Sequence, residues 1–179
     1  MATVNLHPGS SVVSGSNWDI IGGGTLHSSL ADSDDATLIR NDTQNETVIF
    51  LLDDLHASLS GVTITSVRFY VRGVLYNTRS GNTDIQVILT DASDTTYYAE
   101  TVTLNFTGGY APEDHYGTAR TTSDGSTSWT VSDIDGLRLN INTSPEDPPG
   151  SSYAQIVKAY VEVTYTAAVD DAIFFGTNF

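Results

Sequence analysis

The stretch YAQIVKAYVEVTYT, residues 153–166, decides the fold class of this chain of 179 residues. From 157 to 165 the odd positions are Val, Ala, Val, Val and Tyr, and the even positions between them are Lys, Tyr, Glu and Thr. Because side chains of a strand point alternately to opposite faces, this order predicts a long strand with one buried face and one exposed face. Such strands are typical of antiparallel sheets.

The same alternation recurs upstream, at 67–72, 85–89, 102–106 and 137–142. Residues Val48 to Leu52 form a continuous apolar run instead, which predicts a strand covered on both faces. Turn-forming segments rich in Gly, Asn, Asp, Ser and Pro separate the runs. Short strands joined by such turns predict an all-β, jelly-roll-like sandwich of two antiparallel sheets.

One segment favours a helix. Thr130 and Asp133 have the spacing of a capping box, and Gly136 follows as a stop signal, so at most a one-turn helix is expected near 131–136. Residues 108–128 are rich in Gly, Thr, Ser and Asp and are expected to form a long surface loop.

The chain is expected to form a single sandwich domain over 1–169, followed by a C-terminal apolar arm at 170–179. Four large apolar residues mark this arm: Ile173, Phe174, Phe175 and Phe179. Left exposed, such groups promote association. The arm is therefore expected to dock on a neighbouring chain, and the alternative is an edge strand of its own sandwich.

Charge narrows the range of partners. The 22 acidic and 7 basic residues give a net charge of -15, which opposes binding to nucleic acids and to anionic membranes. The chain has no cysteine, so disulfides and thiolate metal sites are excluded. The first residues have neither the basic nor the apolar region of a signal peptide. Synthesis in a bacterial cytoplasm is the expectation.

Acidic clusters are the weak candidates for metal binding. Asp32, Asp34 and Asp35 would offer oxygen ligands to calcium, but they lack the spacing of an EF-hand loop. Aspartates in turns of β proteins usually accept hydrogen bonds from backbone amides, and these three are expected to do the same. The four histidines show no metal-binding spacing, so neither a metal nor another cofactor is expected.

The long loop holds the densest group of polar and aromatic residues. Its candidates for exposed contacts are Tyr110, Glu113, Asp114, His115 and Tyr116. Trp18 and Trp129 lie next to apolar residues and are expected in the core, not on a sugar-binding surface. No G-x-S-x-G motif or other catalytic signature is present, so an enzyme is not expected.

Three segments together resemble small jelly-roll virion proteins of tailed bacteriophages, of the capsid decoration or cement type. These segments are SWTVSDIDGLRLNI, QIVKAYVEVTYT and an early strand pair around TLIRNDTQNETVIFLL. Within them, Trp129, Thr130, Asp133 and Ile134 match the group's segment before a strand, and Val161, Val163 and Tyr165 match its closing strand. The resemblance spans about residues 15–166 and implies no catalytic residues.

The resemblance implies a non-enzymatic structural protein on the outer surface of a phage capsid. Its partners would be the major capsid protein or another virion protein, and a homo-oligomer, by analogy a trimer, is expected. The alternative is a carbohydrate-binding or adhesin domain of a tail or of a larger enzyme. A third option is a glycan hydrolase on a jelly roll, which would require two suitably spaced carboxylates.

Overall fold

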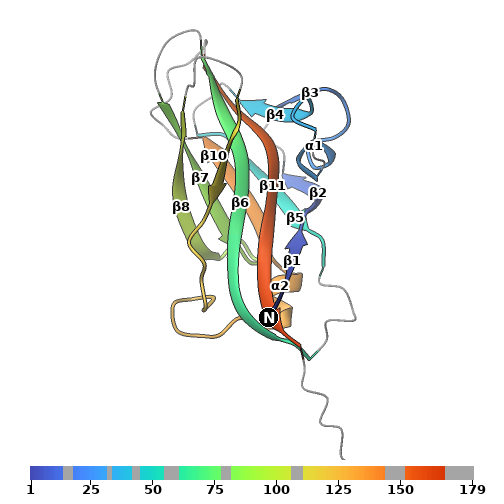
Figure 1. The fold of residues 1–179 in the computed structure, drawn as a ribbon, viewed down its shortest axis with the longest axis vertical. Helices are drawn as coiled ribbons and strands as arrows, with labels where there is room; N and C mark the ends of the chain where they lie inside the picture. The colour runs from blue at the N-terminus through green and yellow to red at the C-terminus, as the bar shows by residue number, and fades with distance from the viewer. Residues whose placement is uncertain are drawn as a thin grey trace, which may run out of the picture.

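The computed structural model describes residues 1–13, 18–31, 34–41, 45–54, 61–77, 82–105, 111–143 and 152–167. Two antiparallel sheets pack face to face, as predicted (Figure 1). The elements in chain order are β1 (Ala2–Leu6), β2 (Pro8–Val13), β3 (Asp19–Ile21), α1 (Ser28–Ala31), β4 (Leu38–Asn41), β5 (Thr47–Leu52), β6 (Thr63–Asn77), β7 (Asn82–Thr90), β8 (Thr96–Asn105), β9 (Glu113–Tyr116), α2 (Val131–Asp135), β10 (Arg138–Thr143) and β11 (Ser152–Thr166).

Sheet A is organised around its two longest strands, β6 and β11, which lie side by side through most of the molecule (Figure 1). Its order is β3-β4-β11-β6-β9. The other edge of β11 is divided between two strands: β4 pairs with residues 154–156, and β1 pairs with residues 161–165. Sheet B has the order β2-β5-β10-β7-β8.

The core lies between the sheets and follows the predicted alternation except at a β-bulge in β11, where Ile156 and Ala159 belong to the core cluster and Val157 does not. Phe69, Val87, Leu139 and Val161 are fully buried, as expected, and Val157 and Val163 are nearly or fully so. Both tryptophans are buried as well, with Trp18 at 7% and Trp129 at 4% exposure. Gly117 packs against the core at Phe69, because a Cβ there would lie 2.4 Å from the Phe69 ring. Only glycine fits beside this ring.

The helix prediction is confirmed at α2. Thr130 accepts a hydrogen bond from the Asp133 amide, and the Asp133 carboxylate accepts one from the Thr130 amide, which completes the capping box. A second one-turn helix, α1, was not predicted. Among the described residues no helix is long and apolar enough to span a membrane.

Three local predictions are wrong. The apolar run of β5 is not covered on both faces, because Leu51 is 38% exposed while Val48, Phe50 and Leu52 face the core. The region 108–128 is not simply a loop, since β9 forms the edge of sheet A within it. The early strand pair is not a pair: β4 belongs to sheet A and β5 to sheet B.

Candidate functional site

The outer face of sheet A carries a row of rings that crosses three neighbouring strands and reaches the end of a fourth. Tyr160 of β11 pairs with Tyr70 of β6, and Tyr70 pairs with Tyr116 of β9. His7 follows β1 directly, beside Tyr160. Their strand neighbours Leu6, Phe69 and Val161 point into the core, so these four rings point outward. We call His7, Tyr160, Tyr70 and Tyr116 the aromatic row.

Adjacent rings of the aromatic row are in contact. The Tyr70 and Tyr160 rings stack with centroids 4.4 Å apart, and Tyr116 tilts against Tyr70 at 5.0 Å. His7 lies 5.5 Å from Tyr160. Tyr70 and Tyr160 are 6% and 9% exposed although they face outward, whereas Tyr116 is 52% exposed. The aromatic row thus consists of closely packed rings and ends in one accessible ring, Tyr116, on the edge strand.

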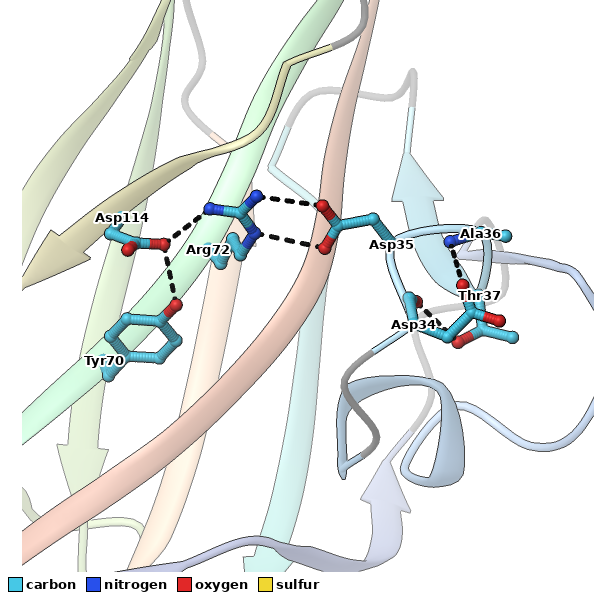
Figure 2. Close-up of polar contacts among 7 residues, drawn as sticks. All are labelled: Asp34, Asp35, Ala36, Thr37, Tyr70, Arg72 and Asp114. Atoms are coloured by element: carbon cyan, nitrogen blue, oxygen red, sulfur yellow. Dashed lines mark hydrogen bonds and ion pairs between the residues drawn. The ribbon is translucent and has the colours of Figure 1, made fainter.

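An ion-pair network borders one side of the aromatic row (Figure 2). Arg72 donates to both carboxylate oxygens of Asp35, from Nε at 3.1 Å and from Nη2 at 2.9 Å. Its Nη1 donates to Asp114 Oδ1 at 2.8 Å, and the Tyr70 hydroxyl donates to the same oxygen at 2.8 Å. Because Asp35 precedes β4 while Arg72 lies on β6, this network ties the turn before β4 across β11.

The network fixes the protonation states of its members. Hydrogen bonds from Arg72 lower the pKa of Asp35, and hydrogen bonds from Arg72 and Tyr70 lower the pKa of Asp114. Burial, followed by the hydrogen bond to Asp114, raises the pKa of Tyr70. Both carboxylates are therefore ionised and both the phenol and the guanidinium are protonated at neutral pH. The cluster offers fixed donors and acceptors instead of a titrating acid or base.

A second ion pair borders the other side of the aromatic row. Arg68 Nε donates to Glu162 Oε1 at 2.7 Å, on neighbouring positions of β6 and β11. The Arg68 guanidinium carbon lies 4.6 Å from the centroid of the Tyr116 ring. The exposed ring at the end of the row therefore has a charged hydrogen-bond donor against it.

The far end of the same face carries a second aromatic pair. Tyr76 of β6 and Tyr153 of β11 are cross-strand partners with ring centroids 6.1 Å apart, and Tyr76 is 48% exposed. Arg40 lies over the Tyr153 ring and forms an ion pair with Asp19. Between the two ring groups, the outward-facing Val74 is only 1% exposed, so the middle of the face is covered.

The predicted constellation of Glu113, Asp114 and His115 is split by strand geometry. Because the three lie on β9, Asp114 and Tyr116 share the outer face, while Glu113 and His115 point the other way. Glu113 accepts a hydrogen bond from Asn105 of β8, at the edge of the sandwich. Burial lowers the pKa of His115. Of the predicted contact residues, Asp114 and Tyr116 thus belong to the site, and Tyr110 lies outside the described residues.

The acidic candidates for metal binding have other partners. Asp35 belongs to the Arg72 network, and the Asp34 carboxylate accepts a hydrogen bond from the Ala36 amide (Figure 2). Asp32 lies outside the described residues. No group of three or more potential metal ligands occurs within the described ranges. The four apolar residues of the C-terminal arm also fall outside the described part of the chain.

Sequence reasoning missed most of the site. The missed residues are His7, Arg68, Arg72, Tyr160 and Glu162. Their signal was present in the outward positions of β6 and β11, where the alternation places Arg-Tyr-Arg opposite Lys-Tyr-Glu. Aromatic and opposite-charge pairs across neighbouring strands also stabilise ordinary sheets, so this pattern alone assigns no function to the surface.

Comparisons with known proteins support the fold. No protein-family model and no curated protein matches the chain. Among solved structures, an arabinose-bound α-L-arabinofuranosidase, MgGH51, has a TM-score of 0.50 at 8% identity; the match covers 89% of this chain and 26% of the enzyme. At that identity the likeness establishes a shared sandwich fold and no more.

Two further similar structures are modules of comparable size. The CBM36-1 domain of a multidomain xylanase from the hindgut metagenome of Trinervitermes trinervoides is 12% identical, with 91% of this chain and 97% of the module covered and a TM-score of 0.43. The CBM22-1 xylan-binding domain of Xyn10C from Paenibacillus barcinonensis is 10% identical, with 92% and 95% covered and the same TM-score.

These comparisons correct the expected function. The similar structures are carbohydrate-binding modules and a glycoside hydrolase, which contradicts the expectation of a phage capsid decoration protein.

Proposed function

We propose that this chain is a non-catalytic carbohydrate-binding domain that holds a glycan on the outer face of sheet A, around Tyr116. The observation that carries the proposal is the accessible Tyr116 ring, 52% exposed, at the end of a packed aromatic row between two hydrogen-bonding ion pairs.

The chemistry of this face suits sugars. The C–H groups of a pyranose ring pack against the electron-rich face of an aromatic ring, and its hydroxyls require donors and acceptors around that ring. Tyr116 supplies the ring, while Arg68 and Asp114 supply a donor and an acceptor beside it. Because the row beneath is packed, little side-chain order has to be created on binding, which lowers the entropic cost.

The same geometry favours binding over hydrolysis. A glycoside hydrolase needs one carboxyl group that is protonated near neutral pH. On this face the hydrogen bonds from Arg72 lower the pKa of Asp35 and of Asp114, and Glu162 is bound by Arg68. Asp35 and Asp114 are therefore held as ionised acceptors, which is the reverse of what a general acid requires.

Native affinity electrophoresis in gels containing xylan, β-1,4-galactan or arabinan tests the proposal. The full chain should be retarded by at least one polymer, and Tyr116→Ala should reduce the affinity roughly tenfold, because a stacked ring contributes on the order of 1–2 kcal/mol. The matched control is Leu51→Ala, which truncates a residue 38% exposed on the outer face of sheet B. Retention by none of the polymers, or equal losses in both variants, would contradict the proposal.

A further inference from the structure

We propose that Arg68 determines the specificity of this site: its two terminal nitrogens recognise a pair of adjacent hydroxyl groups on the sugar that stacks on Tyr116, and Glu162 positions them. The inference rests on the proposed function and deepens it. It concerns which feature of the glycan is recognised at the ring.

The first support is that the nitrogens of the Arg68 guanidinium have different partners. Its Nε donates to Glu162 at 2.7 Å. Within the described part of the chain, neither of its terminal nitrogens donates a hydrogen bond. The Arg68 side chain is 35% exposed, so the N–H groups on Nη1 and Nη2 remain accessible to acceptors of a ligand.

The second support is a contrast with Arg72 on the same strand. Arg72 uses Nε, Nη1 and Nη2 for contacts with Asp35 and Asp114, so all three of its nitrogens are engaged (Figure 2). Arg72 therefore holds the turn before β4, whereas Arg68 is anchored at one nitrogen only. An arginine fixed at Nε presents its two terminal nitrogens as a planar fork.

The third support is the position of that fork. The guanidinium carbon lies over the Tyr116 ring, 4.6 Å from its centroid, and the ring is still 52% exposed, so a sugar that packs on the uncovered part of the ring brings its hydroxyl groups next to Arg68. Two hydroxyl oxygens on adjacent carbons match two parallel N–H donors. A carboxylate also matches such a fork, but Glu162 already neutralises Arg68, and the chain's charge of -15 repels anionic ligands.

Isothermal titration of the full chain tests the inference, with soluble xylan as the probe, or with galactan or arabinan if that polymer retards the protein. Arg68→Lys keeps the charge but loses the fork, so the affinity should fall at least about tenfold. Arg138→Lys is the matched control, because Arg138 lies on β10 of sheet B and pairs with Asp94 in the turn between β7 and β8 at 2.5 Å. It should bind like the native chain.

Partial O-acetylation of the same polymer identifies the recognised group. Acetylation removes one hydroxyl of an adjacent pair, so the native chain should prefer the deacetylated form about tenfold, and Arg68→Ala should lose this preference. Glu162→Ala should lower the affinity, and Glu162→Gln, which keeps an acceptor for Arg68 Nε, should largely restore it.

Three outcomes would overturn the inference. Equal preference for deacetylated polymer in the native chain and in Arg68→Ala would show that Arg68 does not recognise the hydroxyl groups. Native affinity of Arg68→Lys would show that its charge suffices. Loss of stability without loss of affinity in Glu162→Ala would leave Glu162 a structural role only. In each case Tyr116-dependent binding would persist, whereas the failure of the proposed function would abolish binding by the native chain.

Discussion

The two sheets of this sandwich share a core but present different outer faces. Sheet A exposes rings and guanidinium groups joined by ion pairs, whereas sheet B presents mainly Thr, Asn, Gln, Ile and Leu. Polar contacts on sheet B join neighbouring strands, as between Asn142 and Thr47 or between Thr103 and Asp84. The Arg72 network on sheet A instead joins three segments. Hydrogen bonds of the first kind hold neighbouring strands of a sheet together, whereas the Arg72 network fixes side chains of three segments relative to one another on one outer face.

Truncating the core should have the largest effect and should not distinguish the sheets. Phe69 of sheet A and Phe50 of sheet B are both fully buried. Phe69→Ala and Phe50→Ala should each lower the free energy of unfolding by about 3–5 kcal/mol, measured by denaturant titration. If Phe69→Ala left the unfolding midpoint unchanged, the assignment of inner and outer faces in β6 would be wrong.

Removing a guanidinium group should lower the stability by different amounts on the two outer faces. Arg72→Met breaks contacts to two carboxylates, one of them bidentate, while Arg138→Met breaks one contact to Asp94 on sheet B. The first change should cost about 1 kcal/mol and the second less, because Arg138 loses a single contact, to an Asp94 carboxylate that is 62% exposed. Denaturant titrations of both variants provide the measurement. A larger loss of unfolding free energy in Arg138→Met would show that the Arg72 network does not contribute more to stability than the Arg138 ion pair.

The Arg72 network should also affect how the stability depends on pH in acid. The pKa values of Asp35 and Asp114 are lowered by hydrogen bonds from Arg72, so the folded state binds protons less readily than the unfolded chain. Their stabilising contribution is present above pH about 4 and is lost as the pH falls through the folded values. Stability should therefore fall less steeply below pH 4 in Arg72→Met. An unchanged acid slope would contradict the assignment.

The smallest effect is expected from His7. Burial lowers its pKa, the nearby Lys158 lowers it further, and Asp53 opposes the shift. The unfolded chain therefore binds the proton more readily, and stability is lost as the pH falls below about 6.5. His7→Gln should flatten the stability profile between pH 7 and 5. Because burial also lowers the pKa of His115 at the sandwich edge, His115→Gln serves as the comparison variant.

Elements whose signals are local can be predicted from the sequence alone. The alternation in 67–72 and 157–165 correctly assigns Phe69 and Val161 to the core, because the side-chain period of a strand is a property of its own backbone. The capping box at Thr130 and Asp133 is equally local. The prediction that β5 is covered on both faces was wrong, because apolar content alone does not show which face of a strand is covered. Leu51 lies on the uncovered face.

Which outward-facing side chains lie next to one another depends on the tertiary structure. The aromatic row and its network draw on the segment after β1, the turn before β4, and strands β6, β9 and β11, which are distant in the chain. Strand order and register bring Tyr70, Tyr116 and Tyr160 together, and both depend on which strands pair across long loops. No local signal encodes that pairing. The sequence therefore specified which residues face outward, and the fold determined which of them meet.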